Sequence, residues 1–203
     1  MSFPLAFPNI PIARSYFNIV VNQQVFGSEI SGMRTAVAMN GKTDRWVGAY
    51  VTPLLSQTQH DLFHAWVLSL QGRTGTFQAF DPDRKQPSTL SGGFPGNGQV
   101  NGPGQTGTSL ATSSWPASSL ILRAGDLVQI ESQLYEMTVD VNSDGLGEAT
   151  LSFEPEIRTS PADLASVITS SPVMIARLSS PDFSWNTDIM KTGPVTIAFE
   201  EAL

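Results

Sequence analysis

The segment DVNSDGLGEATL, from Asp140 to Leu151, places oxygen-bearing side chains at the spacing of a calcium-binding loop. Such a loop needs oxygen ligands at its first, third and fifth positions, glycine at the sixth and glutamate at the twelfth. Asp140, Asn142, Asp144 and Gly145 fit the first half, but Leu151 occupies the twelfth position. The flanks QLYEMTV and EATLSFE alternate with the period of strands, not helices. We therefore interpret the segment as a hairpin turn, because Asn, Asp and Gly tolerate positive φ.

Two histidines four residues apart, His60 and His64 in HDLFH, have the spacing of a helix-borne zinc protease site. Asp61 replaces the usual glutamate, and the chain has no third histidine, which leaves only a carboxylate to complete the ligand set. The alternative places both histidines on the solvent side of an amphipathic helix. The incomplete ligand set favours this alternative.

Other catalytic patterns are incomplete as well. No G-x-S-x-G elbow occurs, and the glycines at 96–98 and 102–104 do not lead into the Lys-Ser or Lys-Thr pair of a phosphate loop. Cysteine is absent, which excludes thiolate catalysis and disulfides. We predict a protein that is not an enzyme, without catalytic, cofactor-binding or metal-binding residues.

The composition narrows the function further. The 203 residues include 11 Lys and Arg against 18 Asp and Glu, which gives a net charge of −7. This balance disfavours a protein that binds nucleic-acid phosphates through a basic surface. No apolar run reaches the length of a membrane span, and prolines interrupt the start MSFPLAFPNIPIARSYF. We expect synthesis in the cytoplasm and no membrane anchor.

Short apolar runs, frequent turn residues and few charges predict a mainly β fold. One helix is expected at about 57–71, because Ser56 and Gln59 form a capping box and Gly72 supplies a left-handed stop. Its buried stripe should pack on a sheet, with Phe77 as a partner, and consists of Leu62, Phe63, Trp66, Val67 and Leu70. Strands are expected at 16–22, 35–40, 45–51, 74–80, 119–131, 133–141, 148–157, 174–179, 183–188 and 194–203.

The chain divides into three parts. Residues 88–107 are so rich in Gly, Pro, Asn and Ser that we expect a linker or exposed loop. Residues 108–173 should form a compact β domain, with turns at Gly125-Asp126 and Gly145. The last strand needs an existing sheet, so residues 1–87 and 174–203 should form one domain into which the middle unit is inserted.

The tryptophans raise a second functional class, since sugar-binding modules stack sugars on exposed rings. We expect Trp46, Trp66 and Trp185 to be buried and Trp115, in SSWPASS, to be exposed. One exposed ring makes a weak glycan platform, so carbohydrate binding is the alternative to an assembly role.

Several stretches together form a pattern typical of one protein family: Arg45-Trp46, 51–53, Phe63-His64-Ala65-Trp66, Leu70-Gln71-Gly72-Arg73, Phe77–Pro82, Leu122–Asp126, 135–137, 144–147 and Pro155-Glu156-Ile157-Arg158. This pattern resembles minor tail proteins of long-tailed bacteriophages, in particular the distal tail protein group. They cover most of the chain from about residue 45 to 201.

The resemblance implies a discontinuous β-sandwich with one helix and an inserted small β-barrel-like domain. It also implies a hexameric ring of this chain at the virion's tail tip, which joins the tail tube protein to the hub and fibre proteins. We further hypothesise that acidic side chains line the lumen, so that DNA passes through without specific binding. A closed ring requires complementary patches on opposite sides of each subunit.

Overall fold

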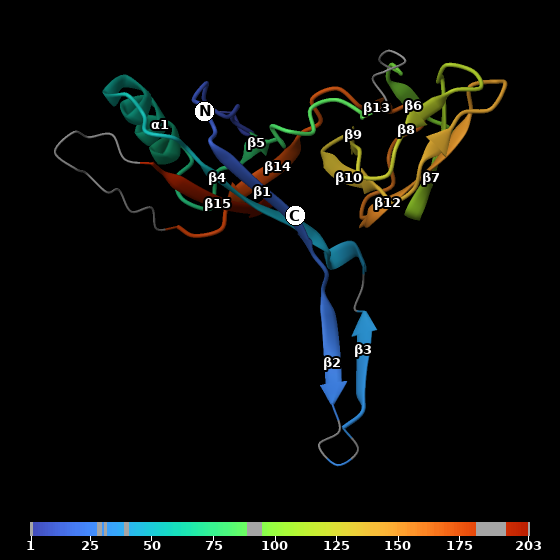
Figure 1. Cartoon of the computed structure of the whole chain (residues 1–203), viewed down its shortest axis with the longest axis horizontal. Helices are drawn as coiled ribbons and strands as arrows, with labels where there is room; N and C mark the ends of the chain where they lie inside the picture. Colours follow the sequence, from blue (N-terminus) through green and yellow to red (C-terminus); the bar gives the residue numbers. More distant parts are fainter. Residues whose placement is uncertain are drawn as a thin grey trace.

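The computed structural model describes residues 2–27, 30, 32–38, 41–88, 95–181 and 194–202. An open sheet, a closed barrel and a projecting hairpin make up the described chain, together with one α-helix (Figure 1). The predicted fold class is confirmed: the protein is mainly β, with a single helix and a barrel-like insert. The strand predicted at 183–188, and Trp185 within it, lie outside the described residues.

The sheet contains five antiparallel strands drawn from both ends of the sequence. Their spatial order is β1 (Arg14–Val20), β4 (Arg45–Val51), β15 (Thr196–Glu201), β14 (Met174–Leu178) and β5 (Phe77–Ala79). The C-terminal strand β15 pairs with both β4 and β14, so it fills a central position in the sheet. Gly48 of β4 makes this pairing fit, because a Cβ there would lie 2.6 Å from the ring of Phe199.

Helix α1 (Gln57–Ser69) covers one side of this sheet. The predicted capping box is present: Gln59 N donates to Ser56 Oγ (3.4 Å), and Ser56 N donates to Gln59 Oε1 (3.0 Å). The predicted stripe is buried except for Leu62, which is 50% exposed. Leu62 lies about 100° around the helix from Phe63, outside the narrow face that reaches the sheet. The helix ends at Ser69, earlier than expected, and is followed by residues with positive φ at Gln71 and Gly72.

An aromatic cluster fills the space between helix and sheet. Phe7 from the N-terminal segment meets Tyr50 and Trp66 edge to face, with ring centroids 5.0 and 5.3 Å apart. Phe77 packs against Trp66 at 5.1 Å, as predicted, and Trp66 Nε1 donates to Ala6 O (2.9 Å). Such edge-to-face pairs stabilise a core beyond the area they bury.

The barrel is closed by six strands. Their order is β10 (Gln133–Met137), β12 (Ala149–Ile157), β7 (Gly107–Ser113), β6 (Gly98–Val100), β13 (Ser166–Ile168) and β9 (Leu127–Ile130). The expectation of a linker throughout 88–107 is wrong in its second half, because β6 lies there and pairs with β7 and β13. Glycine suits β6, since Gly98 lies directly under the ring of Trp115.

A small two-stranded sheet is formed by β8 (Leu120–Leu122) and β11 (Val141–Asn142), and Leu122 and Val141 belong to the buried core of the barrel. The hairpin interpretation of Asp140–Leu151 is therefore incomplete. Strands β10 and β12 do pair antiparallel, but the chain between them leaves to form β11 before it turns back. The positive φ in that turn belongs to Gly147, at +78°, instead of the predicted Gly145.

A hairpin of β2 (Gln23–Gly27) and β3 (Arg34–Ala38) projects away from both sheet and barrel (Figure 1). We call residues 23–38 the arm. It continues from β1 and returns through the short 3₁₀ helix η1 (Gly41–Thr43) into β4. The strand predicted at 35–40 thus belongs to the arm and not to the body, and β2 was not predicted.

Candidate assembly surfaces

In the calcium-like segment, a carboxylate accepts hydrogen bonds from the backbone of the same segment. Asp144 Oδ1 accepts hydrogen bonds from the N–H groups of Leu146 (2.8 Å) and Glu148 (2.9 Å). The bond from Glu148, then that from Leu146, lowers the pKa of Asp144. Within the described residues, no three His, Asp or Glu side chains are grouped so that they could hold a metal ion. The segment is a capped loop.

The histidines of HDLFH lie half-buried on α1, beside the buried stripe. His60 Nδ1 is 3.9 Å from Asp61 Oδ1, on the neighbouring residue. In a helix-borne zinc site, the carboxylate next to the first histidine acts on the metal-bound water. Here the carboxylate of Asp61 lies against the ring of His60 instead. The structure therefore brings no third ligand to this pair among its described residues.

The tryptophans bear directly on the glycan alternative. Trp46 and Trp66 are buried, as predicted. Trp115 is only 5% exposed, so the prediction of an exposed ring is wrong. Its Nε1 donates to Thr112 Oγ1 (2.8 Å), and its ring covers Gly98. The signal for this burial is a glycine seventeen positions earlier, a long-range contact that local sequence does not reveal.

The predicted turn residues Gly125 and Asp126 have a structural role at the entry to the barrel. Gly125 adopts φ +89°, which favours glycine. Asp126 is buried, and its two carboxylate oxygens accept from Ser88 N and Arg123 N, both at 2.8 Å. One side chain thereby fixes the connecting segment to the barrel turn.

The junction between barrel and sheet is built around a buried ion pair. Arg158, just after β12, contacts Glu201 of β15 through both guanidinium nitrogens, at 2.6 and 2.7 Å. The same guanidinium donates to Lys42 O (3.2 Å) and Asp44 O (2.5 Å) at the base of the arm. Trp46 Nε1 donates across the junction to Leu134 O (2.8 Å). A bidentate pair in which each of the three guanidinium nitrogens donates to an oxygen gives a defined geometry.

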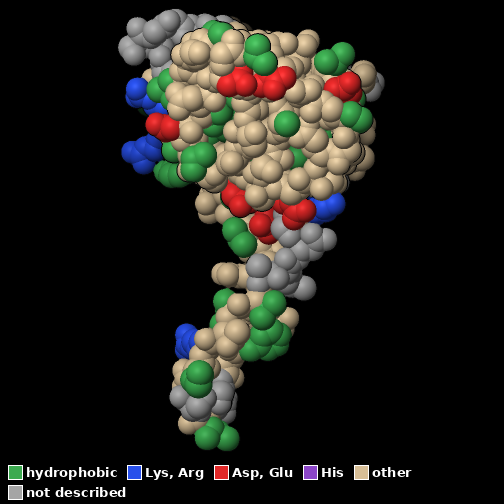
Figure 2. Space-filling model, turned by 90° about the vertical axis from the view of Figure 1, so that its right-hand side faces the viewer, with side chains coloured by type: hydrophobic (Ala, Val, Ile, Leu, Met, Phe, Trp, Pro, Cys, Tyr) green, Lys and Arg blue, Asp and Glu red, His purple; other side chains and the backbone are tan. Residues whose placement is uncertain are grey.

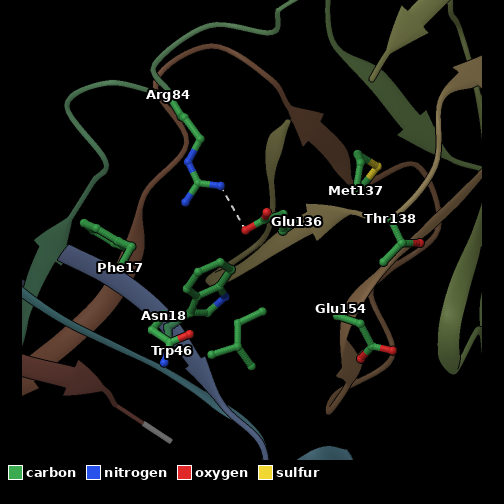
Figure 3. Close-up of a pocket in the computed structure, with 9 residues that line it drawn as sticks. Phe17, Asn18, Trp46, Arg84, Glu136, Met137, Thr138 and Glu154 are labelled. Atoms are coloured by element: carbon green, nitrogen blue, oxygen red, sulfur yellow. Dashed lines mark ion pairs between the residues drawn. The ribbon is translucent and has the colours of Figure 1, made fainter. Parts of the chain in front are cut away.

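An open cleft of about 630 Å³ lies beside this junction (Figure 3). Arg84 spans it: Nε donates to Asp81 Oδ2 at 2.8 Å, and Nη1 lies 2.9 Å from Glu136 Oε2 on the barrel. Burial alone would lower the pKa of Arg84, but the hydrogen bonds to Asp81 and Glu136 raise it. Arg84 is thus a second ionic link between the two units. The cleft therefore contains a structural ion pair.

The arm presents apolar side chains on both of its faces. Val25 and Phe26 of β2 are 55% and 54% exposed, and Met33 and Val37 are exposed as well. Figure 2 shows hydrophobic side chains along the arm below the barrel. Cross-strand pairing places Phe26 against Thr35 and Val25 against Ala36. Exposed apolar surface on a projecting element is typical of a binding surface.

The net charge is concentrated on the barrel. Residues 95–169 contain nine acidic and two basic side chains, a balance of −7, whereas the rest of the chain has nine of each. Figure 2, viewed from the barrel side, shows acidic groups spread over this part of the molecule. The sheet-bearing part is therefore neutral as a whole, and the two units differ strongly in electrostatic potential.

No protein-family model matches the chain, and no curated protein matches it. Among the residues described, no helix is long and apolar enough to cross a membrane. Function must therefore be argued from the surfaces themselves.

Proposed function

We propose that the protein is a non-enzymatic structural subunit of a phage tail tip, which assembles into a ring, six-fold by the resemblance given above. In this proposal the ring lies between the tail tube protein and the hub and fibre proteins in the virion. The resemblance supplies the tail context, and one structural observation supports assembly: the arm exposes apolar side chains on both faces. By contrast, the junction beside the base of the arm is held by the ion pair of Arg158 with Glu201.

The energetics of the arm support this proposal. A two-stranded hairpin is marginally stable in water, and each of its outer edges carries backbone groups available for pairing. In the described residues, β2 and β3 pair only with each other. An arm with exposed apolar side chains gains stability when another surface buries them. In a ring, the neighbouring subunit would supply that surface.

The acidic wall of the proposed lumen can be assigned to one part of the subunit. An acidic wall that lets DNA slide would have to come from the barrel, because the acidic excess lies there. The carbohydrate-binding alternative also changes, since Trp115 is buried. It would have to use a polar cleft on the barrel lined by Asn101, Asn142 and Glu148, without Trp115 as a stacking platform.

The first experiment is a measurement of native mass over a range of concentrations, with negative-stain imaging of any assembly. Its matched variant replaces residues 24–37 by Asn-Gly, which joins the paired residues Gln23 and Ala38 through a two-residue turn. We expect closed rings from the full chain and monomers from the shortened chain, with equal melting temperatures. Two-fold dimers or open filaments would contradict the ring, and rings from the shortened chain would contradict the role of the arm.

A further inference from the structure

The side of the five-stranded sheet that faces away from α1 carries exposed side chains. Register places Tyr16, Ala49 and Ala198 in one row across β1, β4 and β15, and the next row contains Val47, Glu200 and Arg177. The alternate row, with Phe17, Gly48 and Phe199, faces the core. Tyr16 and Ala198 are exposed, and Val47 and Ala49 are half-buried. We call this side the open sheet face.

Three arginines converge on the open sheet face around a single carboxylate. Glu200 Oε1 accepts from Arg73 Nη2 (2.5 Å) and Arg177 Nε (3.2 Å), and Arg45 Nε lies 3.6 Å from Glu200 Oε2. One negative charge cannot neutralise three positive ones, so the cluster carries an excess of two. The side chains of Arg45, Arg73 and Arg177 are 43%, 46% and 35% exposed, so their outer edges can reach a second anion.

The barrel carries a loop whose charge is opposite to that of the arginine cluster. The segment 139–148, which leads into β12, lies at the end of the barrel away from the sheet (Figure 1). Asp140, Asp144 and Glu148 are exposed on it, and Leu146 at its tip is 85% exposed. The hydrogen bonds from Leu146 N and Glu148 N to Asp144 hold the loop in one conformation. We call residues 139–148 the acidic loop.

We propose that the acidic loop of one copy docks on the open sheet face of the next copy. The proposal rests on the proposed ring and names one of its contacts. Carboxylates of the loop meet the excess positive charge of the arginine cluster, and Leu146 meets the apolar row that contains Tyr16 and Ala198. The contact is heterologous, because each subunit binds one neighbour through its acidic loop and the other neighbour through its open sheet face, as a closed ring requires. Complementary charge also selects this pairing over contacts between like surfaces.

Disulfide trapping tests this contact, because the chain contains no cysteine of its own. Two variants, Leu146→Cys and Ala198→Cys, are purified separately, labelled by different mass tags, mixed and oxidised. We expect more of the mixed disulfide, relative to the two homodimers, than random pairing of the two variants would give. This excess should fall as the salt concentration rises from about 50 mM to about 500 mM. The matched control is Ala65→Cys, an exposed alanine on α1, which should give only the random share with Leu146→Cys.

The outcomes separate this contact from the ring itself. Rings in negative stain without an excess of the mixed disulfide would overturn the contact and leave the ring proposal standing. An excess of the mixed disulfide in open chains would support the contact and contradict the ring. Binding of duplex DNA that is lost in Arg177→Glu, with no excess of the mixed disulfide, would assign the open sheet face to a nucleic acid and overturn the proposal.

Discussion

The junction lies next to the base of the arm, at residues 42 and 44. The two regions differ in how far their side chains are buried and bonded within the chain. At the junction, the buried Glu201 is paired with the partly buried Arg158, and Arg158 also donates to the carbonyls of residues 42 and 44. A few residues away, Val25 and Phe26 of the arm are more than half exposed. The junction is satisfied within a single chain, whereas the apolar side chains of the arm are exposed.

This difference indicates where stability and assembly are encoded. Arg158 holds the chain at residues 42 and 44 to the junction, whereas the residues of strand β2 in the arm are all exposed. Substitutions at the junction should therefore change folding, and substitutions on the arm should change association.

Arg158→Ala should destabilise the monomer by about 3–5 kcal/mol, because it leaves the carboxylate of Glu201 buried without its partner. Denaturant unfolding of the monomer measures this loss. Arg123→Ala is the matched control, since Arg123 is exposed on the same barrel and its removal should change stability by no more than about 0.5 kcal/mol. Equal unfolding midpoints for the two variants would show that the pair does not hold the junction.

Gly48→Ala should cost about 1–3 kcal/mol, because the new methyl group would press on the Phe199 ring and on Tyr16 O, each 2.6 Å away. Gly27→Ala in the arm is the comparison, since its Cβ would lie 3.9 Å from the nearest atom, Arg34 Cγ. Thermal unfolding of both variants should show a lower melting temperature for Gly48→Ala alone. A similar loss from Gly27→Ala would mean that the arm is packed more tightly than its exposure indicates.

Local patterns predicted the elements whose evidence lies within one stretch of sequence. Strand β4 occupies the predicted residues 45–51, and the capping box at Ser56 sets the start of α1. The short strands β6 and β13 were missed, because three residues carry too little periodicity and their pairing partners are distant. Arg158 and Glu201 lie 43 positions apart, so no local pattern could join them.

The arm was missed for a different reason. Its β2 strand has apolar side chains on both faces without a buried side, so it lacks the one-sided alternation by which a half-buried strand is recognised. The available signal was the pair of apolar runs QQVF and TAVA on either side of a Gly- and Ser-containing turn. That pattern indicates a hairpin but not whether the hairpin packs on its own body.

Phe26→Ser combined with Val37→Ser should leave monomer stability within about 0.5 kcal/mol of the parent protein, because both side chains are already exposed. The same double variant should lose ring assembly in native mass measurements. Leu62→Ser on α1 is the control, since it removes a similarly exposed apolar side chain from the body. Assembly that survives the arm variant and fails in Leu62→Ser would place the association surface on the helix.

The smallest expected effect concerns Glu154 at the rim of the junction cleft. Partial burial there raises its pKa, and the neighbouring carboxylates of Asp44 and Glu156 raise it further. A raised carboxyl pKa means that the folded protein binds the proton more tightly than the unfolded chain does, so ionised Glu154 opposes folding at pH 7. Glu154→Gln should therefore stabilise the protein slightly at pH 7. As the pH falls through the raised pKa, Glu154 of the parent protein takes up a proton, and the difference between the two proteins should disappear. Urea unfolding at a series of pH values measures this difference, and a stability gap that grows toward acid pH would mean that Glu154 makes a favourable contact as a carboxylate.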